Sequence, residues 1–209
     1  MKLSSIFIPR SVRSKLACAS AVAMTAFALS AGSAQALCPY TGAEQVFKPW
    51  LDLQHYVLAP DGGFEAGASG WSLNGGARTV AGNESYYLND TGDKRSLSLP
   101  AGSSVGSPPI CMSLDTPIFR MFARNTGDPS SRLRVEAVFK LLGILRTKDV
   151  STVTAGSAWA PTQQMSTVLS LSTIVGTLTP SAIQIRITPL DDKGKWQVDD
   201  LFIDPYARR

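Results

Sequence analysis

"RLRVEAVFK" (Arg132–Lys140) alternates between apolar and polar side chains, and a period of two residues is typical of a β-strand with one buried face. Its apolar side chains share one parity and would line that face: Leu133, Val135, Ala137 and Phe139. The chain continues through "LLG" into "ILRTKDVSTV" (Ile144–Val153), and a second run after a short glycine turn indicates a β-hairpin. The stretch therefore predicts antiparallel β-structure with one face in a core.

The same alternation recurs on both sides of this hairpin. Strand-like runs cover Ser96–Pro100, Pro117–Asn125, Ala182–Thr188 and Trp196–Asp204, with turn-forming residues between them. No helical pattern alternates with these runs, which argues against a parallel α/β sheet. We expect an all-β chain that forms an antiparallel β-sandwich of the jelly-roll type.

The first 36 residues have the organisation of a bacterial secretory signal peptide. Four basic residues precede a short apolar run, and "AQA" (Ala34–Ala36) supplies small residues for cleavage. No later segment is long and apolar enough to span a bilayer, so we expect a secreted chain without a membrane anchor. We predict a signal peptide over residues 1–36, a short irregular or helical segment over residues 37–60 that packs on the sandwich, and a β-sandwich domain over residues 61–209.

The basic excess of the chain belongs to the export signal. The chain has 20 Lys and Arg against 16 Asp and Glu, and four of the basic residues but none of the acidic ones lie in residues 1–36. The mature chain therefore has no net charge, and its composition gives no support for nucleic-acid binding. Its length suits one domain with a hydrophobic core, and we expect a monomer.

The glycine-rich segment "GGFEAGASGWSLNGGA" (Gly62–Ala77) has neither the spacing of a dinucleotide-binding loop nor a Gly-Lys-Ser/Thr, and no helix follows it. It does not predict a phosphate site. Phe64 and Trp71 are better interpreted as core residues, with glycines forming the turns between short strands.

Two cysteines remain after the signal peptide, Cys38 and Cys111. In an exported protein such a pair predicts a disulfide, and the alternative is two buried free thiols. With one histidine and two bridged cysteines, the mature chain has too few of the usual ligands for a zinc site. Calcium needs only oxygen ligands, so it remains compatible with this composition.

A hydrolase is the less favoured class of function. "GSSVG" (Gly102–Gly106) matches the pattern around a nucleophilic serine, but Pro108 and Pro109 follow where that motif requires a helix. A triad of Ser104 with the single histidine, His55, is therefore not supported. Glycoside hydrolysis needs two carboxylates across a cleft, and the sequence pattern brings no such pair together. We expect a non-enzymatic protein.

The last strand-like run carries an adjacent carboxylate pair, Asp199 and Asp200. Trp196 and Val198 share one parity, whereas Leu201 and Ile203 have the other. Either a β-bulge switches the face there, or the strand is buried on both faces. A carboxylate that faces inward would need a cation or an arginine, because an unpaired buried charge is costly.

The two ends of the domain resemble a known fold family. "GGFEAGASGW" (Gly62–Trp71) paired with "WQVDDLFIDP" (Trp196–Pro205) resembles the galactose-binding-like jelly rolls, especially carbohydrate-binding modules, and is also similar to a group of uncharacterised secreted actinobacterial proteins. The resemblance implies that the first and last strands meet around a structural calcium. It would place Glu65 and Asp200 at this calcium, together with Asp199, and the alternative is a salt bridge from one of these acids to an arginine.

The resemblance also implies a carbohydrate or cell-surface glycan as partner. Sugars bind to aromatic faces beside planar hydrogen-bonding groups. The candidate ligand-binding residues are Tyr86, Tyr87, Trp159, Arg120 and Arg124. If extended, the two tyrosines point to opposite faces. Arg120 and Arg124 share a strand face that is either a binding surface or a structural face salt-bridged to Glu136.

From these patterns we expect a secreted, non-enzymatic binding module for carbohydrate. The alternative is a structural or protein-binding sandwich of the cell wall or extracellular matrix, with no sugar ligand.

Overall fold

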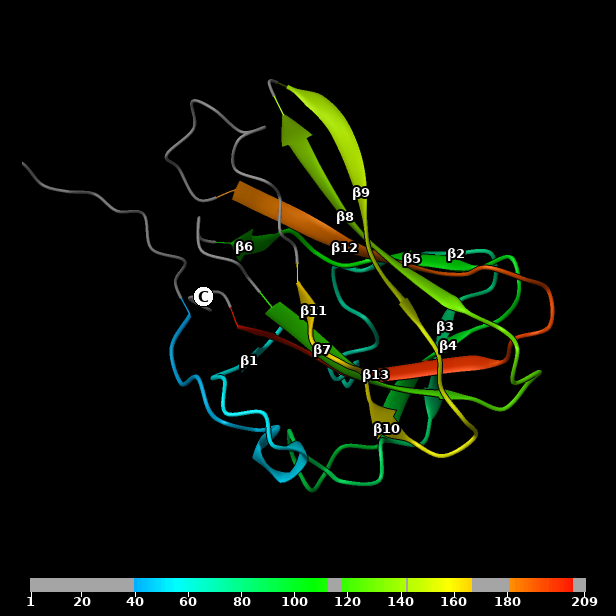
Figure 1. Cartoon of the computed structure of the whole chain (residues 1–209), viewed down its shortest axis with the longest axis horizontal. Coiled ribbons are helices and arrows are strands. Elements are labelled where there is room, and N and C mark those ends of the chain that lie inside the picture. Colours follow the sequence, from blue (N-terminus) through cyan, green and yellow to red (C-terminus); the bar gives the residue numbers. More distant parts are fainter. Residues whose placement is uncertain (1–39, 113–117, 142, 167–180, 205–209) are drawn as a thin grey trace, which may run out of the picture. The chain divides into compact units, whose positions relative to one another are not determined.

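The computed structural model describes residues 40–112, 118–141, 143–166 and 181–204, which belong to the compact unit Gln35–Arg209. The predicted signal peptide and Cys38 lie outside these residues. Within the described part, no helix is both long and apolar enough to cross a membrane. The described chain forms two antiparallel sheets that pack face to face, as Figure 1 shows.

The first sheet has seven strands in the order β10-β7-β13-β4-β3, with β1 paired to β13 and β11 paired to β7. Its strands are β1 (Val57–Leu58), β3 (Arg78–Ala81), β4 (Arg95–Leu99), β7 (Ile118–Asn125), β10 (Ala160–Pro161), β11 (Met165–Ser166) and β13 (Trp196–Asp204). It is the lower layer in Figure 1.

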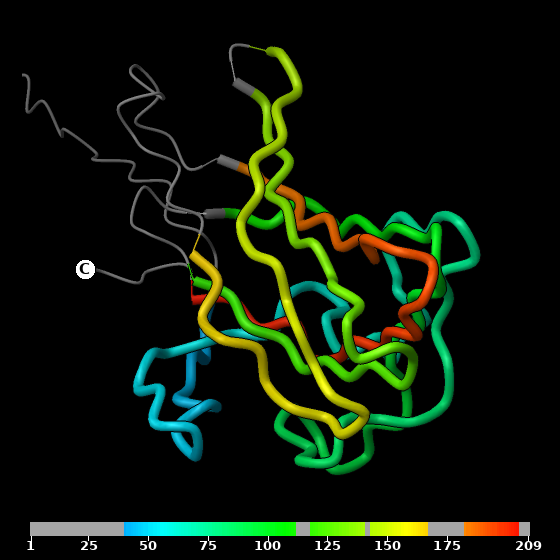
Figure 2. Tube along the Cα trace, turned by 45° about the vertical axis from the view of Figure 1, so that its right-hand side comes forward, coloured from blue at the N-terminus to red at the C-terminus, as the bar shows by residue number. Residues whose placement is uncertain are grey.

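The second sheet has six strands in the order β2-β5-β12-β8-β9, with β6 paired to β12. Its strands are β2 (Ser72–Asn74), β5 (Ser104–Gly106), β6 (Ile110–Met112), β8 (Leu133–Leu141), β9 (Ile144–Val153) and β12 (Ser181–Pro189). The hairpin of β8 and β9 stands out at the top of Figure 2. The prediction of an all-β antiparallel sandwich is confirmed.

The core lies between the sheets and is built from the residues whose parity the sequence pattern predicted. Val135 and Ala137 of β8 are fully buried in one cluster with Ile185 of β12. Phe64 and Trp71 also belong to this cluster, with ring centroids 5.0 Å apart. The indole N–H of Trp71 donates to the Pro60 carbonyl at 3.0 Å, which fixes the glycine-rich segment against the core.

The face switch in β13 comes from a β-bulge. The register with β7 shifts between Asp199 and Phe202, because Asp199 lies opposite Phe122 and Phe202 lies opposite Arg120. Asp200 is the extra residue, and its φ of 47° is in the left-handed region. Both interpretations of this strand therefore hold, since its residues on both faces are also buried apart from the half-buried Gln197.

The segment before the sandwich packs against the outer face of the seven-stranded sheet. It contains one 3₁₀ turn, η1 (Lys48–Trp50), with Pro49 in its first turn. Phe47 is fully buried there in a second apolar cluster that includes Phe122 and Phe202. The outer face of this sheet is thus partly covered by a segment that is distant from β7 and β13 in the sequence.

Cys111 lies in β6, and its backbone N–H donates to the Tyr40 hydroxyl at 3.1 Å. This bond brings the chain two residues after Cys38 next to Cys111. Cys38 lies outside the described residues, so the Cys38–Cys111 disulfide stays a prediction.

Candidate functional site

One row of polar side chains crosses the outer face of the seven-stranded sheet. Gln197 of β13 lies directly opposite Arg124 of β7 on one side and opposite Ser98 of β4 on the other. Arg78 of β3 lies opposite Ser98 and completes the row. Residues directly opposite each other in an antiparallel pair point to the same face. The four side chains therefore share one surface, the polar row.

Arg124 is held in one orientation by two neighbours. Its Nε–H donates to Gln197 Oε1 at 2.6 Å, and its guanidinium carbon lies 4.7 Å from the ring centroid of Trp159. Trp159 is itself only 7% exposed, so it offers little open surface to a ligand. Its role here is to support the guanidinium by a cation–π contact.

A hollow of about 300 Å³ opens at the end of the polar row. Its lining includes Arg78, Ser98 and Gln197 from the row, together with Thr126 and Lys195. The side chains of Arg78 and Lys195 are exposed, and that of Arg124 beside the hollow is half-buried. Among the residues that the structure describes, none of these three cations forms an ion pair.

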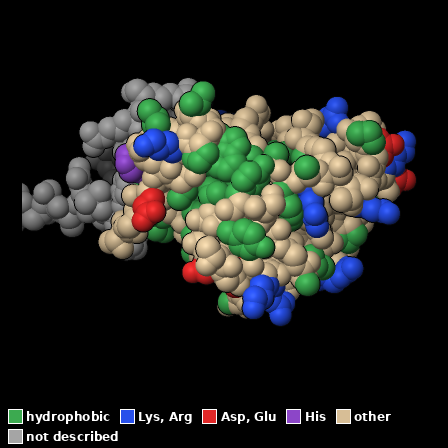
Figure 3. Space-filling view, turned by 90° about the horizontal axis from the view of Figure 1, so that it is seen from below, with side chains coloured by type: hydrophobic (Ala, Val, Ile, Leu, Met, Phe, Trp, Pro, Cys, Tyr) green, Lys and Arg blue, Asp and Glu red, His purple; other side chains and the backbone are tan. Residues whose placement is uncertain are grey.

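An aromatic patch lies next to the row. Tyr86 packs between Trp50 and Phe122, with ring centroids 5.0 Å and 5.4 Å away, and Phe122 precedes Arg124 by two residues on the same face. Tyr86 is 48% exposed and Trp50 is half-buried, so both present ring surface to solvent. Figure 3 looks onto this side of the molecule and shows apolar side chains gathered in its middle, with Lys and Arg around them.

The loop that carries Tyr86 is docked on β13. The Glu84 N–H donates to Asp199 Oδ2 at 2.9 Å, and the Glu84 carboxylate accepts the N–H groups of Tyr86 and Leu88. Burial raises the pKa of Asp199 to about 9, and the neighbouring charge of Asp200 adds to this shift. The buried Asp199 thus supports the loop and does not reach the polar row.

The two tyrosines differ in their surroundings, and the stretch that carries them is a turn instead of an extended strand. Tyr87 is 47% exposed and has a φ of 53°, which turns it away from an extended course. Within the described part of the chain, only Tyr86 of the two has an aromatic partner.

Arg120 does not belong to this site. It is 6% exposed, its Nη1 lies 2.7 Å from Asp52 Oδ2, and its Nε–H donates to the Thr162 carbonyl at 2.7 Å. The Tyr56 hydroxyl donates to the same Asp52 oxygen at 2.8 Å. Arg120 therefore has a structural role in an ion pair, which was the alternative to ligand binding, and its partner is Asp52. The suggested pairing with Glu136 is wrong, because Glu136 lies on the other sheet and pairs with Arg186 at 2.8 Å.

A cluster of acidic and amide side chains surrounds the bulge. Asp200 is fully buried, and neither of its carboxylate oxygens makes a hydrogen bond of normal geometry to any described residue. A Cβ at Gly63 would lie 3.0 Å from Asp200 Oδ1 and 3.8 Å from Asp93 Oδ2, so both carboxylates flank the same point. The Asn89 amide donates to Asp93 Oδ2 at 2.8 Å. The Gly63 turn and the last strand thus meet there, and the calcium that the family resemblance implies at the meeting of the first and last strands stays a prediction.

The environment of Asp200 opposes its negative charge. Burial raises its pKa to about 7, and the charges of Glu84 and Asp93 add to the shift. The Asn89 backbone N–H lies close enough to the Asp200 carboxylate to lower its pKa in part, although the two do not form a hydrogen bond of normal geometry. A hard cation with oxygen ligands fits this orphaned carboxylate, with Asp93 as a further ligand. The described residues hold no group of three His, Cys, Asp or Glu side chains suited to a metal. Backbone oxygens or water would therefore have to complete the shell.

The other two predicted metal ligands are engaged elsewhere. Glu65 is exposed, and its Oε1 accepts the N–H groups of Lys94 and Arg95 at 2.7 Å and 2.6 Å. Its charge still reaches Asp200 and raises that pKa. The Asp199 carboxylate accepts the N–H groups of Glu84 and Asp200, on the outer face of the sheet.

Sequence reasoning missed the residues that build most of the site. Gln197, Ser98, Arg78 and Lys195 lie on three strands or their ends, and no local pattern connects them. The parity of β13 could have placed Gln197 on the outer face, since its neighbours Trp196 and Val198 point to the core.

No protein-family model matches this chain, and no curated protein matches it. Solved structures share the fold. The tandem CBM22-1–CBM22-2 domain of Paenibacillus barcinonensis Xyn10C matches 75% of this chain and 46% of its own length, at 14% identity and a TM-score of 0.50. The CBM22-1–GH10 modules of Clostridium thermocellum xylanase 10B, in complex with xylohexaose, match 69% of this chain and 28% of their own length, at 14% identity and a TM-score of 0.49. The chain has the galactose-binding-like fold of carbohydrate-binding modules.

Proposed function

We propose that this chain is a secreted, non-enzymatic module that binds a glycan on the outer face of its seven-stranded sheet. The observation that carries the proposal is the polar row of Arg124, Gln197, Ser98 and Arg78, which borders a hollow of about 300 Å³ and the aromatic patch. Four neighbouring strands contribute to the row, so it spans roughly 14 Å at the usual strand spacing. That length suits a short stretch of a polysaccharide chain.

The chemistry of the surface matches the two sides of a sugar ring. The exposed ring surfaces of Tyr86 and Trp50 suit the apolar C–H patches of a pyranose. Gln197, Ser98 and the fixed guanidinium of Arg124 offer donors and acceptors to its hydroxyl groups. Because packing and hydrogen bonds hold Arg124 in place, little side-chain entropy is lost when a ligand binds.

A binding role is favoured over glycoside hydrolysis by the composition of the hollow. Hydrolysis needs two carboxylates that face each other across the bond to be broken. The described lining of the hollow contains two cations and no Asp or Glu. Ser104 and His55 lie on different sides of the sandwich, in β5 and in the segment that covers the other sheet.

A structural calcium at Asp200 is part of the proposal. We assign Asp200 and Asp93 as its side-chain ligands, and Glu65 as a nearby negative charge. Calcium would neutralise the orphaned carboxylate and join the Gly63 turn, the loop of Asn89 and β13. Asp199 supports the loop on the other face of the same strand.

The test is retention of the purified chain by immobilised polysaccharides. We expect retention by at least one glycan, and Arg124→Ala should lower the affinity about tenfold because a fixed donor group is lost. Arg146→Ala is the matched control, since Arg146 is an exposed arginine on the β9 side of the molecule. Release of reducing ends should stay at the level of buffer. Retention by no glycan, from a folded protein, would contradict the proposal and favour a structural or protein-binding sandwich.

A further inference from the structure

The hollow on the seven-stranded sheet gathers positive charge that no described acid neutralises. Arg78 and Lys195 contribute to its lining and Arg124 stands at its side, and none of them forms an ion pair within residues 40–112, 118–141, 143–166 and 181–204. Residues 37–209 have as many acidic as basic side chains, so two cations in the lining of one hollow and a third beside its Gln197 are a local feature.

The backbone around the hollow is fixed, which leaves the cationic groups for a ligand. The Lys195 N–H donates to Asn125 Oδ1 and its carbonyl accepts the Thr126 N–H, both at 3.0 Å, so its position at the start of β13 is set. Arg124 uses its Nε–H on Gln197, which leaves the terminal guanidinium nitrogens. Those nitrogens form the fork that binds a planar anion with two parallel hydrogen bonds.

We propose that the ligand of this hollow is an anionic polysaccharide, whose carboxylate or sulfate groups are bound by Arg78, Arg124 and Lys195. This inference rests on the proposed function and adds the charge of the ligand to it. A single strand of nucleic acid is the less suitable anion, because its binding surfaces are extended basic stripes, whereas these cations are confined to one hollow and its edge.

The experiment compares polymers that differ only in charge. Polygalacturonate is compared with its fully methyl-esterified form, and dextran sulfate with dextran, so the two pairs distinguish a carboxylate from a sulfate. We expect the purified chain to bind at least one anionic polymer at least tenfold more tightly than its neutral partner, with an affinity that falls as salt is added.

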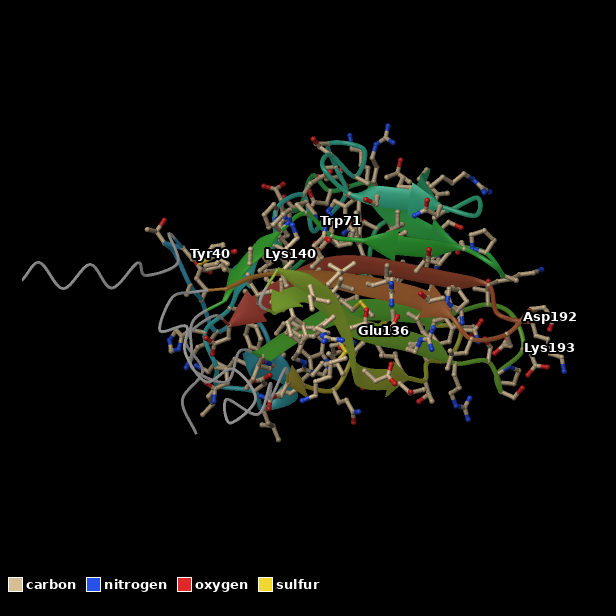
Figure 4. All side chains as sticks on the ribbon, turned by 90° about the horizontal axis from the view of Figure 1, so that it is seen from above. Tyr40, Trp71, Glu136, Lys140, Asp192 and Lys193 are labelled. Atoms are coloured by element: carbon tan, nitrogen blue, oxygen red, sulfur yellow. The ribbon has the colours of Figure 1, made fainter. Side chains whose placement is uncertain are left out.

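Substitutions that remove a positive charge from the hollow test whether its cations bind the anionic groups. Lys195→Gln and Arg78→Gln should each lower the affinity for the anionic polymer about tenfold and should lower any affinity for the neutral polymer by much less. Lys140→Gln is the matched control, because Lys140 is an exposed lysine on the other sheet (Figure 4) and should change neither affinity.

Each contrary outcome has a separate meaning. Equal retention of charged and neutral polymers would overturn the inference and leave the proposed function standing, whereas retention of neither would overturn both. Equal losses for Lys195→Gln and Lys140→Gln would overturn the inference by showing diffuse charge attraction. Binding of poly(dT) or poly(U) as tight as that of the anionic glycan would also overturn it.

Discussion

Arginines on the outer faces of the two sheets have different neighbours: Arg134 and Arg186 of the six-stranded sheet flank a carboxylate, whereas Arg124 of the seven-stranded sheet lies beside an amide. On the six-stranded sheet, Glu136 is 5% exposed and lies between Arg134 and Arg186, with nitrogen–oxygen distances of 3.5 Å and 2.8 Å. Figure 4 shows Glu136 near the middle of that sheet. On the seven-stranded sheet, the polar row places Gln197 beside Arg124 where the other sheet has a carboxylate. The residue opposite an arginine decides whether its charge is neutralised by the fold or remains for a ligand.

The two sheets also differ in the segments that cover their outer faces. The seven-stranded sheet carries the N-terminal segment and the loop of Glu84 and Tyr86 on its outer face, and these supply the aromatic patch beside the polar row. Exposed ion pairs contribute little to stability, whereas a buried pair whose partner is removed leaves an uncompensated charge. The two faces therefore predict different results for similar substitutions.

The largest loss of stability is expected at the ion pair between Arg120 and Asp52, which joins the N-terminal segment to the sheet. Arg120→Ala would leave Asp52 buried without its guanidinium partner and should lower the free energy of unfolding by about 3–5 kcal/mol. Urea denaturation measures this loss. Arg134→Ala on the other face is the control and should cost about 1 kcal/mol or less. Equal losses for the two variants would show that the pair with Asp52 is no more structural than a surface pair.

A smaller effect is expected at the bulge, from removal of calcium. In chelator, the folded-state pKa of Asp200 is raised to about 7, so its contribution to stability is full below its ordinary pKa and is lost as pH rises through 7. The melting temperature in chelator should therefore fall by several degrees between about pH 4.5 and pH 8. Calcium should reverse the fall, because it binds the ionised carboxylate.

Asp200→Asn is the test variant for this site. It should abolish the response to calcium and reduce the fall in melting temperature between about pH 4.5 and pH 8, as followed by circular dichroism. Asp192→Asn is the control at the exposed turn between β12 and β13, where Figure 4 labels the residue. A calcium response that survives in Asp200→Asn would place the metal elsewhere.

The two adjacent tyrosines sharpen the comparison further, because they are almost equally exposed at 48% and 47%. Tyr86→Ala should lower glycan affinity by about tenfold, since it removes the ring that packs on Trp50 and Phe122 beside the polar row. Tyr87→Ala should have little effect. Isothermal titration with the retained glycan measures both, and a larger loss for Tyr87→Ala would move the binding surface off the patch.

The smallest effect is expected on the ion-paired face. The Arg186 hydrogen bond lowers the pKa of Glu136, so its stabilisation is present above its ordinary pKa and is lost as pH falls through the lower folded value. Glu136→Gln should cost about 1 kcal/mol or less, because both arginines are 40% exposed. It should leave glycan retention unchanged, and a loss of retention would put the binding surface on this sheet.

Much of the fold was predictable because a strand's side chains alternate whatever it pairs with. The parity of Leu133, Val135 and Ala137 placed them correctly in the core, and the mismatched parity around Asp199 predicted either a bulge or a strand buried on both faces. Of the candidate site, Arg124, Tyr86 and Asp200 were indicated by residue type and position. Arg120 has the same parity as Arg124 and could not be told from it, because the segment that buries it is 68 residues away from it in the sequence.

The sequence by itself determined that this chain is an all-β sandwich, which of its residues face inward, and where the last strand is irregular. Only the tertiary structure decided that Gln197 lies opposite Arg124, that Asp52 neutralises Arg120, and that Arg78 and Lys195 line one hollow. The physical reason is that alternation depends on neighbours along the chain, whereas strand register and covering segments depend on which distant residues bury the most apolar surface together.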